Sequence, residues 1–234
     1  MMRQIVLDTE TTGIGPELGH RIIEIGCVEL VDRRLTNNHF HVYLNPQRLV
    51  DEGAFRVHGI STEFLQDKPL FKEIANELIE FIDGAELIIH NAPFDIGFLD
   101  AELKLINASF EIRTRCSVID TLVLAKEKHP GQRNNLDALC KRYEIDNSNR
   151  TLHGALLDAE ILASVYLAMT GGQADLFDDA AELITQSEII IHQPTEQLVS
   201  GSPILEANPE ELRRHEEFIQ FLTKKSGNNL WESE

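Results

Sequence analysis

The order of the hydrophobic patterns most constrains what this chain can fold into, because strand-type runs come first and helical patterns alternate with strands afterwards. Three short apolar, β-branched runs open the sequence at residues 4–8, 22–30 and 39–44, with polar connections between them. Short connections between strands predict an antiparallel meander. From Pro69 onward apolar residues recur at spacings of three and four, which predicts a helix that Gly84 closes.

The remainder of the first 170 residues continues this alternation. Buried-type strands are expected at residues 87–90 and 116–120. Helices are expected at residues 94–105, 120–128, 135–142 and 154–169. Strands that are followed by alternating helices and strands predict an α/β fold, in which helices flank a mixed sheet.

The pattern changes after residue 170, so we expect a catalytic-size domain over residues 1–170 and a different organisation beyond it. Residues 171–205 are predicted to be a flexible acidic linker, and residues 206–234 a C-terminal segment with a short helix near 210–223. Residues 171–234 carry 13 acids against 4 Lys and Arg, so the acidity is concentrated there.

The composition excludes several classes of protein. A net charge of −18 argues against a chain whose main task is to grip long stretches of phosphate backbone. It does not exclude an enzyme that takes one nucleic-acid end into a metal-containing pocket, because bound cations invert the local electrostatics. There is no bilayer-length apolar run and no signal-peptide pattern, so a cytoplasmic protein is expected. The three scattered cysteines have neither disulfide nor zinc-site spacing.

Asp8 and Glu10 form the first candidate site. They stand two residues apart at the end of an apolar strand, so their side chains are expected on one face. Adjacent carboxylates repel and raise one another's pKa unless a cation lies between them, and a hard divalent ion fits such oxygen ligands. An isolated Asp-x-Glu is more often a pair of turn acids facing water, so this signal is weak alone.

Two further acids and a histidine lie at predicted helix starts. Asp95 shares a helix face with Phe98 and is expected on the buried side, although the helix dipole alone also favours an acid there. Asp158 lies on an apolar stripe with Ile161, where a carboxylate is costly unless it is paired or bound to metal. His153 gains a role only through its place about one turn before Asp158, because a lone histidine there is more often a capping or core group.

These motifs together resemble the DEDDh family of 3′→5′ exonucleases, in the ribonuclease H-like group, over residues 4–170. Asp8-Thr9-Glu10 is similar to the first motif of that family. His90-Asn-x-x-Phe94-Asp95 resembles the second motif of that family, and His153-x-x-x-x-Asp158 resembles the third. The related subclass with tyrosine would place Tyr where Gly154 stands, so the histidine subclass is indicated.

Longer stretches, such as IVLDTETTG and ELIIHNAPFDIGF, are similar to the proofreading subunits of bacterial DNA polymerase III. This resemblance implies a 3′→5′ exonuclease that removes mispaired nucleotides from a DNA 3′ end by two-metal hydrolysis. It implies two divalent ions, Mg²⁺ or Mn²⁺, held by the four acids Asp8, Glu10, Asp95 and Asp158. His153 would accept the proton of the attacking water.

The resemblance also implies which residues contact the substrate. These are Asp8, Thr9, Glu10, His58, Phe94 and Asp158, with further contacts from Thr11. One position departs from the subfamily pattern, which has a substrate-contacting Glu five residues before His58. Gly53 stands at that position, and Glu52 is next to it.

Partners are implied by the residues after the domain. Residues 173–177 resemble the peptide that binds the bacterial sliding clamp, through Gln173, Leu176 and Phe177, although a five-residue motif also arises by chance in an acidic linker. The final segment, with the single tryptophan Trp231, resembles the tail that docks on the polymerase III alpha subunit. A small theta-like subunit is a further partner that the resemblance implies, beside a single-stranded or frayed DNA 3′ end.

Two other functions remain as alternatives. An exonuclease of the same fold that trims RNA 3′ ends would use the same five catalytic residues, and only the tail, with its clamp and polymerase peptides, argues against it. A non-catalytic module that bridges clamp and polymerase is the alternative from another class. The presence of all five catalytic-type residues argues against that alternative.

Overall fold

The computed structural model describes residues 2–148, 150, 152–171 and 208–226. Its contacts divide the chain into two units, Met1–Ala181 and Glu182–Glu234, and each is described here by itself. The predicted clamp peptide at 173–177, the linker beyond Gly171 and the predicted docking residue Trp231 lie outside the described residues.

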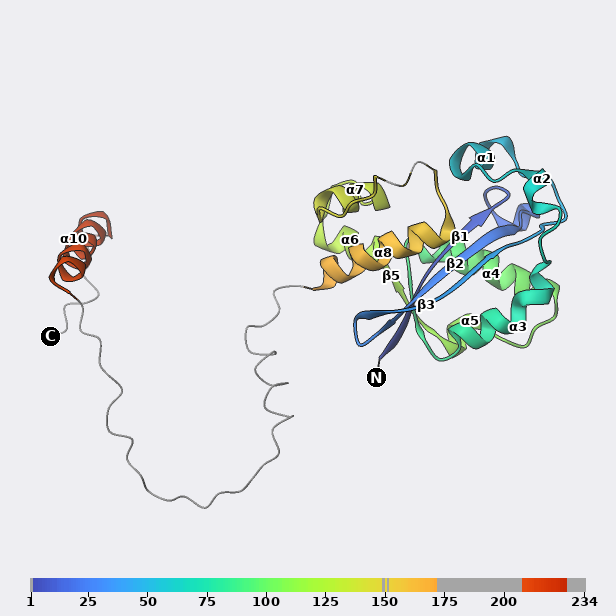
Figure 1. Ribbon diagram of the computed structural model, residues 1–234, viewed down its shortest axis with the longest axis horizontal. Coiled ribbons are helices and arrows are strands. Elements are labelled where there is room, and N and C mark those ends of the chain that lie inside the picture. The colour runs from blue at the N-terminus through green and yellow to red at the C-terminus, as the bar shows by residue number, and fades with distance from the viewer. Residues whose placement is uncertain (1, 149, 151, 172–207, 227–234) are drawn as a thin grey trace, which may run out of the picture. The chain divides into compact units, whose positions relative to one another are not determined.

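A five-stranded mixed sheet forms the centre of the first unit, in the order β3-β2-β1-β4-β5 (Figure 1). Strands β1 (Arg3–Thr11), β2 (Ile22–Val31) and β3 (Arg34–Tyr43) pair antiparallel, which confirms the predicted meander. β4 (Glu86–Ile89) pairs parallel with β1, and β5 (Ser117–Asp120) pairs parallel with β4. The ends of β1 and β4 therefore meet at the same edge of the sheet.

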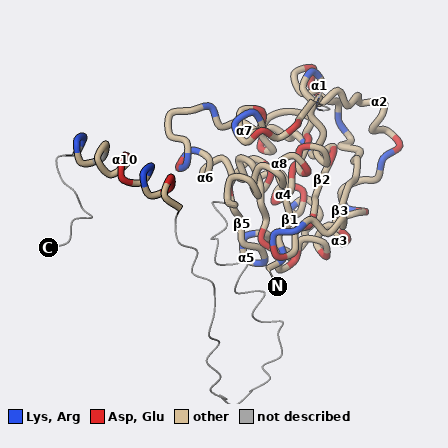
Figure 2. The backbone as a smooth tube through the Cα atoms, turned by 60° about the vertical axis from the view of Figure 1, so that its left-hand side comes forward, with Lys and Arg blue, Asp and Glu red and all other residues tan. Residues whose placement is uncertain are grey.

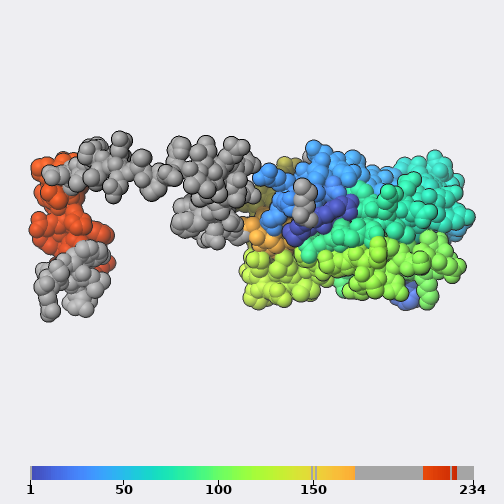
Figure 3. Space-filling view, turned by 90° about the horizontal axis from the view of Figure 1, so that it is seen from below, coloured from blue at the N-terminus to red at the C-terminus, as the bar shows by residue number. Residues whose placement is uncertain are grey.

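Helices cover both faces of this sheet (Figure 1). In the space-filling view of Figure 3, the cyan and green atoms of residues beyond 60 pack closely against the blue atoms of the first strands. One face carries α3 (Phe71–Ile82), α4 (Ala92–Leu105) and α5 (Ile112–Arg115). The other carries α6 (Thr121–Lys128), α7 (Leu136–Arg142) and α8 (Ala155–Thr170). The short elements η1 (Pro16–Leu18), α1 (Glu52–His58) and α2 (Thr62–Leu65) were not predicted from the sequence.

The two cores follow from the alternation of side chains along β1. Ile5 and Leu7 are fully buried in the core under α3 and α4, while Val6 is fully buried in the core under α8. Burial on both faces explains why this strand reads as a continuous apolar run. The same alternation places Asp8 and Glu10 on the face that α8 covers.

Gly26 of β2 allows α8 to start very close to the sheet. It lies opposite Asp8 in the ladder, and a Cβ built there would come within 2.2 Å of the Leu156 nitrogen and 2.4 Å of the Ala155 oxygen. Such distances leave no room for a side chain. The missing side chain of Gly26 therefore brings the first turn of α8, with Asp158, to the end of β1.

Gly26→Ala is expected to destabilise the protein by about 1–3 kcal/mol, the usual cost of overpacking, and to reduce nuclease activity because α8 must move away from β1. Thermal unfolding and nuclease assays measure the two effects. Gly97→Ala in α4 is the matched control, since a Cβ there meets nothing within 4 Å. A Gly26→Ala protein that melts and cleaves like the wild type would show that α8 does not need this close approach.

The second unit contains one described helix, α10 (Pro209–Ser226), in agreement with the helix predicted near 210–223. Asn208 Oδ1 accepts hydrogen bonds from the backbone N–H groups of Glu210 and Glu211, and opposite charges pair along the helix surface (Figure 2). Its large apolar side chains are exposed at Leu212, Phe218 and Phe221. Within the described ranges, no helix has the length and apolar character that a bilayer crossing requires.

Candidate active site

Four carboxylates from three elements meet at the end of β1. Asp8 and Glu10 come from β1, Asp95 from the first turn of α4 and Asp158 from the first turn of α8. Asp95 and Asp158 are each 3% exposed and Glu10 is 9% exposed. The structure thus brings together the acids that the sequence placed at separate strand and helix ends.

Burial and mutual repulsion shift the pKa values of these acids. Burial, and then the charges of Asp95, Glu10 and Asp158, raise the pKa of Asp8 well above its usual range. Burial, and then the charge of Asp158, raise the pKa of Glu10 from 4.5 to about 8. Burial also raises the pKa of Asp95 to about 7, although hydrogen bonds from Thr9 oppose this rise. Carboxylates held in this way are stabilised by a bound cation.

Asp158 differs from the other three acids. Burial alone would raise its pKa, but the hydrogen bonds and the charge of Arg150 outweigh burial and lower it. Arg150 Nε donates to Asp158 Oδ1 at 2.5 Å and Nη2 donates to Oδ2 at 2.8 Å. The buried carboxylate that the sequence marked as needing a partner therefore has one, and the sequence analysis did not identify it.

Thr9 holds Asp95 in place. The backbone N–H of Thr9 donates to Asp95 Oδ1 at 3.0 Å and its hydroxyl donates to the same oxygen at 2.7 Å. Thr9 alternates with Asp8 and Glu10, so it faces α4 rather than α8. Its polar groups are engaged within the protein, and the predicted contact between Thr9 and substrate stays a prediction.

One group of side chains has the arrangement of a metal site. Ligand atoms of Glu10, His153 and Asp158 all lie within 4.8 Å of one another. His153 Nδ1 lies 3.4 Å from Asp158 Oδ2, and the imidazole is 44% exposed. Carboxylate oxygens with one imidazole suit a hard or borderline divalent cation. The donor set therefore fits the metal that the resemblance implies.

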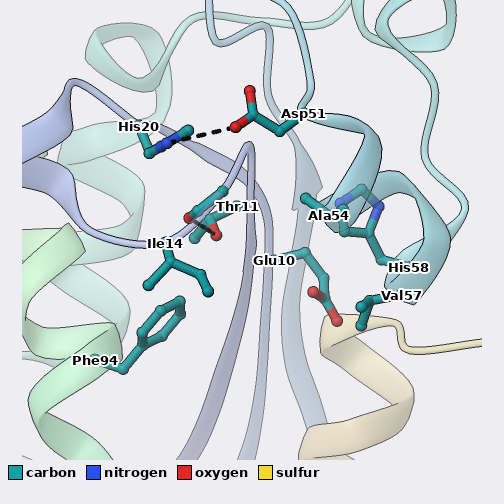
Figure 4. A pocket seen from close by; sticks show the side chains of 11 residues that line it. Glu10, Thr11, Ile14, His20, Asp51, Ala54, Val57, His58 and Phe94 are labelled. Carbon is teal, nitrogen blue, oxygen red and sulfur yellow. Dashed lines mark hydrogen bonds and ion pairs between the residues drawn. The ribbon is translucent and has the colours of Figure 1, made fainter.

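A pocket of about 420 Å³ adjoins Glu10 (Figure 4). Ile14 and Phe94 line one side of it, and Glu10, Val57 and His58 line the other. His58 is 5% exposed; its Nδ1 accepts the Ile60 N–H at 3.0 Å, while Nε2 has no partner. A neutral His58 consequently carries its proton on Nε2, an atom that the surrounding protein buries. Ile14 lies in a loop without periodic pattern, and the sequence analysis did not identify it.

Gly53 also lines this pocket, and a Cβ there would meet nothing within 4 Å. The neighbouring Glu52 is exposed and pairs with Arg56 at 2.8 Å instead of facing the pocket. Glu52 therefore does not replace the glutamate that the subfamily pattern has at position 53.

A second, smaller pocket of about 250 Å³ lies beside the same carboxylates. Its lining includes Asp8, Asp158 and His153 together with Asp137 and Arg150. The carboxylate cluster therefore lies between two pockets. A polymer that occupied both pockets would place one of its backbone bonds next to these acids. A carboxylate quartet with a histidine between such pockets is a candidate site for metal-dependent nuclease chemistry.

Comparison with known proteins agrees with this class. The sequence pattern of the family described as Exonuclease (RNase_T) matches residues 5–166. The DNA polymerase III subunit epsilon of Escherichia coli (strain K12) is 55% identical over 235 residues, covering 98% of this chain and 97% of that protein. The protein of the same name from Pasteurella multocida is 53% identical and covers 98% of this chain and 93% of that protein. This chain therefore belongs to the exonuclease family, in its group of DNA polymerase III epsilon subunits.

Solved structures share the fold. E. coli exonuclease I in complex with single-stranded DNA superimposes with a TM-score of 0.64 at 18% identity, over 81% of this chain and 46% of that one. Exonuclease X in complex with duplex DNA that has a 5′ overhang superimposes with a TM-score of 0.53 at 26% identity, over 75% of this chain and 98% of that one. The predicted ribonuclease H-like sheet with flanking helices is confirmed.

Proposed function

We propose that this chain removes mispaired nucleotides from DNA 3′ ends, in the 3′→5′ direction, as the proofreading subunit of a bacterial replicative polymerase. The observation that supports it best is the carboxylate cluster between two pockets, one of which has the volume of a nucleotide site. Membership of the epsilon group and the exonuclease family agrees with this activity. A purely bridging role would not require four acids to be assembled at a cost in repulsion.

The four carboxylates of Asp8, Glu10, Asp95 and Asp158 are proposed to hold two divalent cations, Mg²⁺ or Mn²⁺. When bound, two such cations supply an activated water and stabilise the leaving 3′ oxygen. The protein contributes the fixed positions of these oxygens, and Thr9 keeps one of them in place through its two hydrogen bonds to Asp95.

Other side chains are proposed to orient the terminal nucleotide and to move the proton. His58, which lines the pocket, is assigned to the sugar, and Phe94 with Ile14 offers an apolar surface for the base. His153, whose imidazole is 44% exposed beside Asp158, is assigned as the acceptor of the proton from water. Selection of mispairs needs no base readout, because a frayed end costs less to unstack into the pocket.

Digestion of primers labelled at the 3′ end tests this proposal. Paired and mispaired DNA and RNA primers are compared with and without Mg²⁺. We expect metal-dependent loss of the 3′ nucleotide from DNA, fastest when it is mispaired. Faster digestion of RNA than of DNA would favour the trimming alternative, and no digestion of any primer would favour the bridging alternative.

Residues 1–170 are proposed as the catalytic domain, and the chain beyond them as a tether with two binding segments. Residues 173–177 are assigned to the sliding clamp and residues 206–234 to the polymerase alpha subunit. The exposed apolar side chains of α10, at Leu212, Phe218 and Phe221, support the second assignment. A theta-like third subunit remains a prediction of the resemblance.

Truncation after Thr170 is expected to leave nuclease activity on free DNA unchanged, because the hydrophobic cores and all proposed catalytic residues precede it. Binding to the clamp and to the polymerase subunit is expected to be lost, as pull-down assays would measure. In the full chain, Leu176→Ala with Phe177→Ala is expected to weaken only the clamp contact, and Trp231→Ala only the polymerase contact. If the 1–170 fragment still bound the polymerase subunit, the docking surface would lie on the catalytic domain.

A further inference from the structure

Arg150 is the residue of the active site that the proposed chemistry does not use. It lies between α7 and α8, and its side chain is only 6% exposed. Its guanidinium contacts three groups: both oxygens of Asp158, Asp137 Oδ1 at 2.6 Å and His153 Nδ1 at 2.9 Å. A buried arginine that forms a two-point pair with one carboxylate and contacts two further groups is held firmly.

The charge of Arg150 opposes the repulsion within the carboxylate cluster. It lowers the pKa values of both Asp8 and Glu10, against burial and the neighbouring acids, which raise them. Burial lowers the pKa of Arg150, but its pairs with Asp158 and Asp137 outweigh burial and raise it, so this side chain stays charged. Arg150 thus supplies part of the positive charge that a divalent cation would otherwise bring.

Arg150 engages both oxygens of Asp158, a carboxylate that is proposed to hold metal. Both oxygens of Asp158 and the Nδ1 lone pair of His153 accept hydrogen bonds from it. Asp158 and His153 are two of the three residues whose ligand atoms group within 4.8 Å. Each Asp158 oxygen directs one lone pair at the guanidinium, so a cation that approaches from the same side competes with Arg150 for these lone pairs.

We propose that Arg150 is an internal counter-cation. It pairs with the Asp158 carboxylate while no metal is bound, and it leaves this carboxylate when metal binds. The inference rests on the proposed metal site. Asp137 on α7 gives the released guanidinium a place to remain, because Arg150 Nη1 already pairs with this more exposed acid. Metal binding and the Arg150–Asp158 pair then exclude each other, and each weakens the other by the same factor.

Arg150→Gln in the full-length protein tests this competition. Mn²⁺ affinity measured by calorimetry is expected to tighten by roughly 5- to 100-fold, the usual range of coupling between two ligands. Without metal the variant is expected to melt at a lower temperature than the wild type, because Asp158 has lost its partner. The rise in melting temperature on Mn²⁺ addition is therefore expected to be larger in the variant.

Arg21→Gln is the matched control. Arg21 forms a similar two-point pair with the buried Glu102, at 2.6 and 2.7 Å, away from the carboxylate cluster. This control is expected to lower the melting temperature with and without Mn²⁺ and to leave Mn²⁺ affinity unchanged. This control separates the loss of stability that follows from breaking any buried ion pair from the gain in Mn²⁺ affinity that follows from removing a competitor of the metal.

Equal Mn²⁺ affinity in wild type and Arg150→Gln would overturn the inference alone, since the pair would then persist beside the metal. Weaker affinity would also overturn it, because Arg150 would then position Asp158 for the metal. Absence of Mn²⁺ binding to the wild type would overturn the proposed metal site as well. If Arg150→Gln does not fold, Arg150→Lys keeps the charge but loses the forked geometry, and its Mn²⁺ affinity is expected to exceed that of the wild type.

Discussion

Asp8→Asn is expected to abolish hydrolysis and to leave the metal-free protein more stable than the wild type. The rate loss should exceed the roughly 10²–10³-fold that a single electrostatic group commonly contributes, because Asp8 lies at the centre of the carboxylate cluster. The gain in stability follows from the raised pKa of Asp8, which burial and three neighbouring acids cause. Primer digestion and thermal unfolding in a chelator measure the two effects.

Asp158→Asn is the informative comparison. It should also abolish hydrolysis, but it should destabilise the metal-free protein, because Arg150 loses its two-point partner. Breaking a buried ion pair commonly costs about 3–5 kcal/mol, and the remaining contact with Asp137 favours the lower end. If both variants cleaved DNA at near-normal rates, the assignment of these acids as metal ligands would be wrong. If both became equally more stable, Arg150 would not stabilise Asp158.

The same shifts predict how stability depends on pH. In the folded, metal-free protein Glu10 has a pKa of about 8 and Asp95 one of about 7, whereas both lose their protons near pH 4 in the unfolded chain. Between about pH 4 and 8 the folded state therefore holds more protons, so the free energy of unfolding falls as pH rises through this range. Saturating Mg²⁺ is expected to remove most of this dependence of the free energy of unfolding on pH, since a bound cation favours the ionised carboxylates.

The sequence predicted the acids of this site but not the cation beside them. Asp158 could be found because a carboxylate on an apolar helix stripe violates the local pattern, whereas Asp8 and Glu10 gave only a weak signal that the resemblance to the family motif strengthened. Arg150 breaks no hydrophobic pattern, because it stands in a polar segment without periodicity. Only the fold shows that its side chain is buried. The sequence analysis therefore treated Asp8 and Asp158 alike, although the structure gives them opposite effects on stability.

The fold could be predicted for a similar reason. Long elements with a clear period, such as α3 and the runs of β1 and β2, were found within one to three residues of their ends. β3 starts at Arg34, five residues earlier than predicted, because its first residues are polar and exposed. Helix α1, which carries His58 to the pocket, has seven residues and only one buried side chain, so its sequence has no amphipathic pattern. Short elements that shape the pocket are thus the ones that periodicity does not predict.

His153→Ala is expected to reduce the rate of hydrolysis by about 10²–10⁴-fold, the usual contribution of a general base, while metal affinity changes little. His153 Nδ1 faces Asp158 Oδ2 at 3.4 Å, and the rest of the ring is open to solvent. The backbone N–H of His153 donates to Val57 O at 3.2 Å, and alanine keeps this bond, so the loop should stay in place. Rate under saturating Mg²⁺ and Mn²⁺ affinity by calorimetry are the two measurements.

Two further observations decide what His153 does. Because its ring is 44% exposed, the space left in His153→Ala is open to solvent, and added imidazole is expected to restore part of the activity. His39→Ala, on the exposed surface of β3, is the control and should change neither the rate nor the response to imidazole. A general base predicts a large loss of rate, imidazole rescue and nearly unchanged Mn²⁺ binding. A loss of Mn²⁺ affinity as large as the loss of rate would instead identify His153 as a metal ligand, which its place within 4.8 Å of Glu10 and Asp158 also permits.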